Sequence, residues 1–226
     1  MSSCAILFAK SPQSGRVKTR LATHCDDRDI LNLYRAFVQD CGETLAACGA
    51  DLKVVAYAPA DGADALRLLL QHHDFTWVAQ PSGSLGQRLQ GLVDWSHRHD
   101  CSNLVALGSD SPSLPVAYID QALDLLASHQ VVLGPCVDGG YYLIGQQANV
   151  DGLFVDIAWS TGAVLEQTIE RIGPRSLGLL PVWYDVDTPT EAGFLKVHLN
   201  ALAKAGALQG RHSRRVLKGL NLPLPS

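Results

Sequence analysis

The chain has 226 residues, of which 47% are hydrophobic and 18% charged, and its formal net charge is -4 at pH 7. This length and composition suit a single α/β domain with a substantial core, and the acidic balance disfavours a general nucleic-acid-binding surface. No apolar run approaches the roughly 20 residues of a membrane span, so we expect none. The six cysteines form no C-x-x-C pair and the chain shows no secretory signal, which predicts free thiols in a cytoplasmic protein.

Short apolar runs alternate with longer helical patterns along the chain. We expect strands over residues 4–9, 52–58, 75–79, 103–108 and 130–135. Helices fill the gaps, and apolar residues at helical spacing predict two of them over 29–48 and 116–127. This alternation of strands and helices predicts a largely parallel sheet that is covered on both faces.

The regular alternation ends after Pro135. Residues 138–145 are typical of a turn followed by an alternating strand, which predicts an insertion on the sheet. Three further elements are expected: a helix from a Ser160 or Thr161 cap to Ile172, a strand over 176–183, and a helix from a Thr188 or Thr190 cap to about residue 205. We therefore place one domain at 1–205 and interpret 206–226 as a basic tail that is solvated or loosely ordered.

The first expected strand ends in a loop that is dense in cations. Gly15 lies within this loop, and its cations are Lys10, Arg16, Lys18 and Arg20. A Pro/Gly loop between a buried strand and a helix start presents backbone N–H groups to an anion. The pattern predicts a polyphosphate site, and the alternative is an ordinary turn whose basic residues are solvated.

Two glycine-rich patterns bear on how a nucleotide would bind. The basic loop is not a Walker A loop, because Val17 and Pro12 stand where that motif needs glycine. The segment 80–88 suits close approach of a nucleotide to the backbone, which makes Gly86 and Arg88 candidate nucleotide-binding residues. The alternative is a plain turn with Arg88 on the surface.

Several carboxylates follow expected strands and turns. Asp110 follows the strand over 103–108 and Asp187 follows the last strand, so both are expected at the edge where ligands bind in open α/β sheets. Magnesium or manganese prefers carboxylates together with phosphate oxygens, so this pair is a candidate metal site, with Asp185 as an alternative second ligand. Asp138 precedes a Gly-Gly pair and is a candidate general base or acceptor ligand. The alternatives are a turn-and-cap element at Asp110 and a solvent-facing hairpin turn at Asp138.

These segments together resemble a bacterial glycosyltransferase-like family, transferase 1, which is associated with radical-SAM and selenium-domain genes and lies within the nucleotide-diphospho-sugar transferase superfamily. The resemblance covers residues 4–200 and rests on the following motifs: Phe8-Ala-Lys-x-Pro-x-x-Gly-x-Val-Lys-Thr-Arg-Leu21, Gly86-x-Arg88, Gly108-Ser-Asp-Ser-Pro112, Gly134-Pro-x-x-Asp-Gly-Gly-Tyr-Tyr-Leu-Ile-Gly145, Trp159-Ser-Thr161 and Asp185-Val-Asp-Thr-Pro189. It implies a single GT-A-like, Rossmann-related domain with a mostly parallel mixed sheet. It also implies a transferase that uses a nucleotide-activated donor and a divalent ion.

Two motifs are also similar to those of phospholactate guanylyltransferases and molybdenum-cofactor nucleotidyltransferases. They are Lys18-Thr-Arg-Leu21 and Asp110-x-Pro112. This resemblance implies that Lys18 and Arg20 hold phosphates and that Asp110 holds magnesium, with Asp187 at a late metal position.

The main functional prediction is glycosyl transfer from an NDP-sugar to a small acceptor. The predicted catalytic residues are Lys18, Asp110 and Asp138, and the predicted ligands of Mg²⁺ or Mn²⁺ are Asp110 and Asp187. One alternative is nucleotidyl transfer, in which a phosphorylated small molecule attacks an NTP and pyrophosphate leaves. The other alternative is a non-catalytic nucleotide-binding protein. The two enzyme hypotheses share a fold and a metal, so the fold alone does not separate them.

Overall fold

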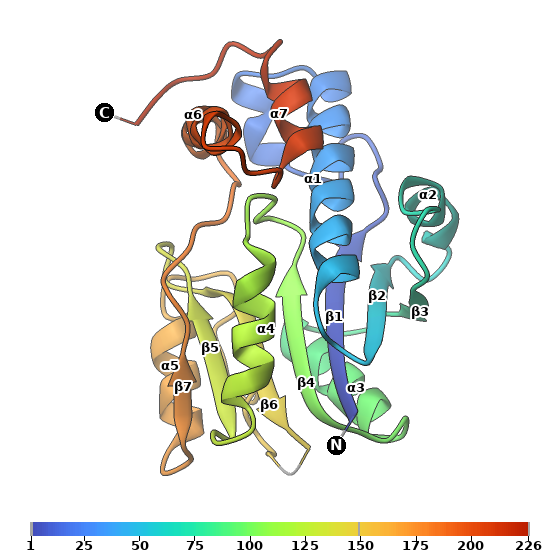
Figure 1. Ribbon diagram of the computed structural model, residues 1–226, viewed down its shortest axis with the longest axis vertical. Helices are drawn as coiled ribbons and strands as arrows, with labels where there is room; N and C mark the ends of the chain where they lie inside the picture. Colours follow the sequence, from blue (N-terminus) through green and yellow to red (C-terminus); the bar gives the residue numbers. More distant parts are fainter. Residues whose placement is uncertain (1, 149, 226) are drawn as a thin grey trace.

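The computed structural model describes residues 2–148 and 150–225, and a single sheet forms its centre (Figure 1). Its strands are β1 (Ser2–Lys10), β2 (Leu52–Ala58), β3 (Thr76–Ala79), β4 (Cys101–Gly108), β5 (Val131–Pro135), β6 (Tyr141–Gln147) and β7 (Leu177–Leu179). Their order is β3-β2-β1-β4-β6-β5-β7. β6 runs antiparallel to both neighbours and the other pairs are parallel. The predicted mostly parallel, mixed sheet is confirmed.

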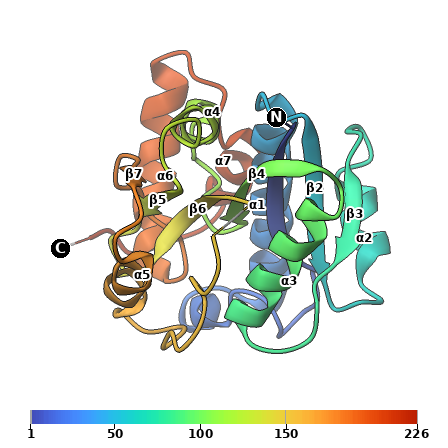
Figure 2. The same ribbon diagram turned by 90° about the horizontal axis from the view of Figure 1, so that it is seen from below.

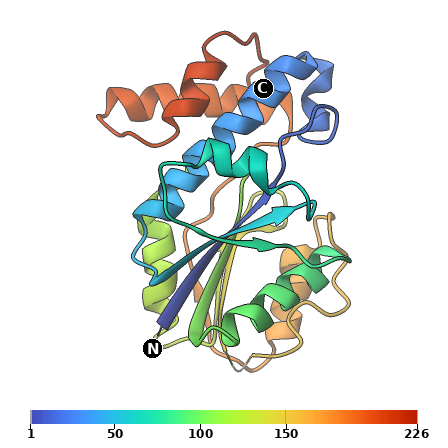
Figure 3. The same cartoon turned by 90° about the vertical axis from the view of Figure 1, so that its right-hand side faces the viewer.

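Helices cover both faces of this sheet, as Figures 2 and 3 show. They are η1 (Thr19–Thr23), α1 (Asp27–Ala47), α2 (Ala63–Leu69), α3 (Leu85–His97), α4 (Val116–Leu125), α5 (Val164–Ile172), α6 (Pro189–Lys204) and α7 (Arg211–Leu217). Successive residues of β1 face opposite sides: Ala5 and Leu7 join the core under α1 and α4, whereas Cys4 and Ile6 join the core under α3. A strand buried on both faces must be apolar throughout, which explains the apolar run in the sequence. Within residues 2–148 and 150–225, no helix combines the length and the apolar character that crossing a membrane requires.

The helices α5 and α6 test the predicted caps. α6 begins after Thr188, whose hydroxyl accepts a hydrogen bond from the first turn in a capping box, so this cap is confirmed. α5 begins at Val164 without a side-chain cap, so the prediction of a cap at Ser160 or Thr161 is wrong. Ser160 has a left-handed backbone with φ 66°, and the Thr161 hydroxyl donates to the Ala158 carbonyl in the preceding turn.

The last strand is shorter than predicted. The sequence predicts a strand over 176–183, whereas β7 covers Leu177–Leu179. Pro181 has no N–H group to donate to a longer ladder, which ends the regular pairing. The chain nevertheless stays beside β5, because the Trp183 N–H donates to the Pro135 carbonyl at 3.0 Å. The acidic segment that follows Trp183 is therefore held at the C-terminal end of β5.

The expectation of a solvated or loosely ordered C-terminal stretch is wrong for α7, which lies against α1 (Figure 1). Ser213 and Leu217 are fully buried in this contact. The Asp40 carboxylate of α1 accepts hydrogen bonds from the backbone N–H groups of His212 at 3.0 Å and Ser213 at 2.8 Å. The domain limit at residue 205 stays a prediction, and α7 packs onto the same body that this limit encloses.

Candidate functional site

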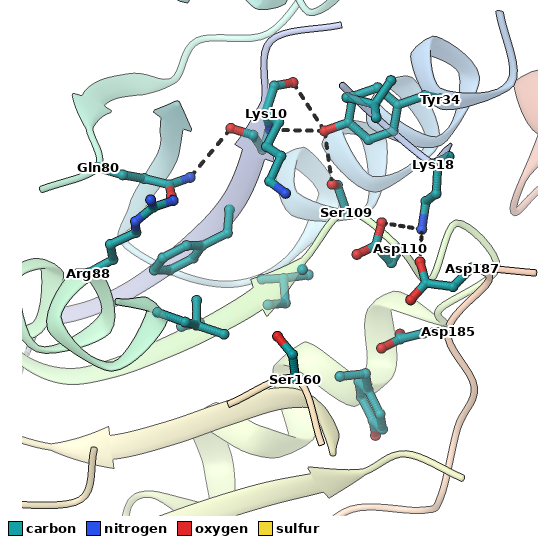
Figure 4. Close-up of a pocket in the computed structure, with 18 of the residues that line it drawn as sticks. Lys10, Lys18, Tyr34, Gln80, Arg88, Ser109, Asp110, Ser160, Asp185 and Asp187 are labelled. Carbon is teal, nitrogen blue, oxygen red and sulfur yellow. Dashed lines mark hydrogen bonds and ion pairs between the residues drawn. The ribbon is translucent and has the colours of Figure 1, made fainter. Parts of the chain in front are cut away.

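A cavity of about 620 Å³ opens where β1 and β4 end. The segments that line it include the loop after β1, the loop after β4, the first turn of α3 and the acidic segment before α6 (Figure 4). β1 and β4 are parallel neighbours, so their carboxyl ends bring two of these loops to one edge of the sheet. This is the edge at which open α/β sheets bind their ligands.

At one end of the cavity, Lys18 joins the two predicted metal ligands (Figure 4). Its Nζ atom lies 2.5 Å from Asp110 Oδ1 and 2.7 Å from Asp187 Oδ1. The Lys18 side chain is 4% exposed, whereas those of Asp110 and Asp187 are 42% and 44% exposed. Lys18 also has a left-handed backbone, with φ 47°. Such a conformation costs a non-glycine residue about 1–3 kcal/mol and is typical of functional sites.

At this end of the cavity, the opposite charges of the lysine and the carboxylates stabilise each other. Burial penalises the Lys18 ammonium, but the carboxylates of Asp110 and Asp187 outweigh that penalty and raise the pKa of Lys18 above its ordinary value. Burial also penalises the Asp187 carboxylate, yet Lys18 and then Arg20 hold the pKa of Asp187 below its usual range. The Arg20 guanidinium is 3.9 Å from Asp187 Oδ2. Lys18 and Asp187 are therefore both charged near neutral pH.

Asp185 lies beside this network and has a different environment. Its carboxylate accepts a hydrogen bond from the Ser111 hydroxyl. Burial, and then the negative charge of Asp110, raise the pKa of Asp185 to about 6. Ligand atoms of Asp185, Cys136 and Asp138 lie within 4.8 Å of one another. A second group of possible cation ligands thus adjoins the first.

Tyr34 of α1 fixes the end of β1. The Lys10 backbone N–H donates to the Tyr34 hydroxyl at 2.9 Å, and that hydroxyl donates to the Lys10 carbonyl at 3.0 Å (Figure 4). The Ser109 hydroxyl, from the loop after β4, is 3.4 Å from the same oxygen. Burial raises the pKa of Tyr34 to about 12, so its hydroxyl keeps its proton near neutral pH. One buried hydroxyl therefore ties together two of the loops that line the cavity.

The opposite end of the cavity is formed by Gln80 and Arg88 (Figure 4). Gln80 Nε2 donates to the Ala56 carbonyl at 2.8 Å, which anchors the amide to β2. Arg88 Nε donates to the Gly83 carbonyl at 3.0 Å, and one of its terminal nitrogens is 3.5 Å from Gln80 Oε1. These contacts hold a polar, cationic group against the cavity wall.

Most of the predicted site residues line the cavity: Lys10, Arg16, Lys18, Arg20, Arg88, Asp110 and Asp187. Gly15, Gly86 and Asp138 are not among the described lining residues. A Cβ atom at Gly86 would lie 2.6 Å from the Phe154 carbonyl oxygen, so this glycine lets α3 pack closely on its neighbour. Asp138 is exposed and accepts a hydrogen bond from the Gly140 N–H at 2.9 Å, which matches the hairpin-turn alternative. The predicted roles of these three residues stay predictions.

Tyr34, Gln80 and Ser160 are among the polar residues of the cavity that were not predicted as site residues. The helical spacing assigns Tyr34 to an apolar face of α1, and nothing local marks its hydroxyl as a contact to another loop. Gln80 begins the glycine-rich segment 80–88, and the nucleotide binding predicted for that segment could have included its side chain. Ser160 lies in the Trp159-Ser-Thr161 motif, but its left-handed backbone follows from tertiary packing.

The donors at the acidic end fit a divalent cation. Carboxylate oxygens are the ligands that Mg²⁺ and Mn²⁺ prefer. Asp110 and Asp187 come from separate loops, yet one oxygen of each converges on a single point, which the Lys18 ammonium occupies. The point is therefore built for positive charge, and the choice of ion stays a prediction.

Comparisons with known proteins identify the family. The model of a bacterial family described as "uncharacterized protein conserved in bacteria" (DUF2064) matches residues 29–161, which is more than half of the chain. No curated protein matches the chain.

Solved structures extend the likeness to nearly the whole chain. A proposed nucleotide-diphospho-sugar transferase from Desulfovibrio desulfuricans G20 is 30% identical, covers 96% of this chain and 95% of its own, and gives a TM-score of 0.86. A cytidylyltransferase from Leptospira borgpetersenii is 12% identical, with coverages of 96% and 94% and a TM-score of 0.61. A Mycobacterium tuberculosis H37Rv protein in complex with manganese is 16% identical, with coverages of 86% and 98% and a TM-score of 0.50. The chain therefore belongs to the DUF2064 family and has the fold of the nucleotide-diphospho-sugar transferases.

Proposed function

We propose that the protein is a transferase that uses a nucleotide-activated donor and a divalent ion, and that it transfers a glycosyl group from an NDP-sugar to a small acceptor. One observation carries the proposal: cations and carboxylates line the same cavity. Lys10 ends β1, Arg16 lies in the loop after it and Arg20 lies in η1, whereas Asp110 and Asp187 come from two other segments. A diphosphate that binds through a metal ion needs both kinds of group within reach.

The size and shape of the cavity support such a donor. Its volume of about 620 Å³ lies within the range of roughly 300–1,000 Å³ that is typical of small-molecule sites. Gln80 and Arg88 lie at one end, Asp110 and Asp187 lie at the other, and Lys10 lies between them (Figure 4). In this proposal the nucleoside binds near Arg88 and the diphosphate binds near the carboxylates.

The charge of each residue then gives it a role. Lys18 and Arg20 bind phosphate oxygens and stabilise the negative charge that develops on them as the donor bond breaks. Arg20 adds a planar, bidentate geometry that lysine lacks. Asp110 and Asp187 would hold Mg²⁺ or Mn²⁺, which supplies further neutralisation of the diphosphate leaving group. Asp138 is the proposed base for the acceptor hydroxyl.

The relative from D. desulfuricans supports the choice of donor. It is a proposed nucleotide-diphospho-sugar transferase, and its 30% identity extends over nearly the whole of both chains. The other solved structures named above share the fold at lower identity, so they do not bear on the donor.

Nucleotidyl transfer is the second candidate, and the position of Asp138 favours it. This carboxylate is exposed and lies outside the described lining of the cavity. A phosphorylated acceptor needs no base there, because its attacking oxygen is already an anion. The cations of the loop after β1 also suit the larger charge of a triphosphate.

Thermal shift with a panel of NDP-sugars and NTPs, each with and without Mg²⁺ or Mn²⁺, tests the proposal. A ligand that binds only the folded state raises its stability by mass action. We expect an NDP-sugar and the matching NDP to raise the unfolding temperature in a metal-dependent way. Selective stabilisation by an NTP would favour nucleotidyl transfer, and no shift with any nucleotide would contradict both enzyme readings.

A matched pair of variants locates the effect. Arg20→Gln removes a cation that lines the cavity, whereas Arg215→Gln removes an exposed cation from α7, outside the cavity lining. The nucleotide-dependent shift should fall in the first variant and persist in the second. Equal shifts in both variants would place the nucleotide elsewhere on the protein.

A further inference from the structure

The ammonium group of Lys18 lies where the proposed metal ion would bind. Its Nζ atom is 2.5 Å from Asp110 Oδ1 and 2.7 Å from Asp187 Oδ1. Mg²⁺ binds carboxylate oxygens at about 2.0–2.1 Å, so an ion held by the same two oxygens would occupy the same point. Two cations cannot share that point, because their atoms would overlap and their charges repel.

Lys18 also differs from the other cations that lie between the end of β1 and η1. Lys10, Arg16 and Arg20 are exposed, as expected of groups that await a ligand from solvent. The Lys18 side chain is 4% exposed. Its ammonium pairs with the two carboxylates and lies over the Phe37 ring, 5.6 Å from the ring centre. In this state Lys18 therefore neutralises protein carboxylates and does not present its charge to a phosphate.

We infer that Lys18 is an internal counter-ion that holds the place of the metal until metal and phosphate bind together. The metal takes the two carboxylates, and the released ammonium takes a phosphate oxygen in the cavity. The phosphate step rests on the proposed function, whereas the competition between ammonium and metal rests on the ion pairs alone. A lysine suits this exchange, because its charge is compact and its four-carbon stem is flexible.

This arrangement couples the two ligands. A metal ion that binds alone must expel the ammonium from its carboxylates without offering it a new partner, which weakens metal binding. A phosphate-bearing ligand supplies that partner, so metal and phosphate strengthen the binding of each other by the same factor. Removal of the ammonium should abolish this competition.

Binding of Mn²⁺ without nucleotide, measured by the electron paramagnetic resonance signal of the free ion, tests the inference. The variants are Lys18→Gln and the control Lys10→Gln, which removes a cation of the same cavity that forms no ion pair within residues 2–148 and 150–225. We expect Lys18→Gln to bind Mn²⁺ about tenfold or more tightly than the wild type, and Lys10→Gln to stay within about threefold. No gain in Lys18→Gln, or an equal gain in both variants, would overturn the inference.

A second measurement uses the unaltered protein, so it does not depend on the folding of a variant. Acetylation by an amine-reactive ester, quantified by mass spectrometry, reports how accessible each lysine is. Lys18 should react slowly in the absence of metal and at least about threefold faster with saturating Mn²⁺, whereas the exposed Lys204 should react at one rate in both conditions. Metal-independent labelling of Lys18 would contradict the exchange.

Neither measurement contains a nucleotide, which separates this inference from the proposed function. If Lys18→Gln gains affinity for Mn²⁺ but no nucleotide binds, the counter-ion role stands and the proposed transferase falls. If nucleotides bind with metal but Lys18→Gln gains nothing, the counter-ion role falls and the proposed transferase stands.

Discussion

Two acidic clusters in this molecule are similar in composition but differ in what surrounds their oxygens. Asp110 and Asp187 share the Lys18 ammonium, and their side chains are 42% and 44% exposed at the cavity. Asp40 and Glu43 lie where α1 meets α7, and together with His212 they bring ligand atoms within 4.8 Å of one another.

The second cluster is nevertheless structural. The Asp40 carboxylate is buried, and the backbone of α7 and the Ser213 hydroxyl already bond to it. Glu43 accepts hydrogen bonds from Arg211 at 2.5 Å and His212 at 2.9 Å. Neighbouring carboxylates therefore mark a ligand site only where their oxygens remain open to a cavity, and variants on each side can sharpen that distinction.

Loss of charge at Asp110 should have the largest effect. Asp110→Asn keeps the size of the side chain but offers a poorer metal ligand, and it leaves Lys18 with one carboxylate. We expect a loss of about 100-fold or more in metal-dependent kcat/KM, measured with the donor that the nucleotide panel identifies. The unfolding temperature should change little, because Asp110 is 42% exposed. Full activity in this variant would contradict the proposed role of Asp110 as a metal ligand.

Removal of the Asp40 carboxylate should instead affect stability. Asp40→Ala leaves two backbone N–H groups and the buried Ser213 hydroxyl without their acceptor. Unsatisfied buried groups of this kind cost a protein roughly 2–4 kcal/mol together. Urea unfolding measures the loss, and nucleotide affinity of the folded fraction serves as the control. A loss below about 1 kcal/mol would mean that the hydrogen bonds of Asp40 contribute little to the stability of the fold.

Glu43 should give the smallest effect, and that effect should depend on pH. Burial would raise the pKa of Glu43, but His212 and Arg211 outweigh it and hold that pKa below its ordinary value of 4.5. A carboxyl whose pKa is lower in the folded state stabilises the protein at pH values above its unfolded-state pKa. This stabilisation is lost as the pH falls through its folded-state pKa. Near pH 7, the free energy of unfolding of the wild type should therefore exceed that of Glu43→Gln. The difference should be less than about 1 kcal/mol, since Glu43 and its partners are partly exposed.

Urea unfolding of both proteins over a range of pH checks this sign. The two free energies of unfolding should converge as the pH falls below the folded pKa of Glu43, where the folded wild type also becomes protonated. A difference that persisted in acid would assign the role of Glu43 to packing and not to its charge.

The sequence could predict the sheet because its signals are local. The central strands are apolar throughout, as burial on both faces requires, and the antiparallel β6 follows a clear change of pattern after Pro135. The cations of the basic loop after β1 are also neighbours in the chain, so their density is visible without a fold. The partners of these cations are not neighbours in the chain. Lys18 and Asp187 are 169 positions apart, and the strand order brings them together.

Contacts that the local sequence does not reveal also decide the surroundings of α7, Gly86 and Asp138. α7 buries only a narrow stripe, which its basic residues conceal in the sequence. The close approach of the Phe154 carbonyl to Gly86 is a contact between segments far apart in the chain, and the nucleotide-binding role of Gly86 stays a prediction. Asp138 lies in a tight turn whose exposed direction depends on packing that its local motif does not encode.

The helix α1 has a practical consequence for anyone who shortens the chain. The Tyr34 hydroxyl forms hydrogen bonds with the main chain of Lys10. Asp40 lies six positions later, about 9 Å along the helix axis, and accepts hydrogen bonds from α7. A protein cut at residue 205 would lose the partners of Asp40, which lies within two turns of the residue that bonds to the end of β1. The segment after residue 205 is therefore a poor place to truncate the chain. A surface tether or purification tag is better added after this segment than used to replace it.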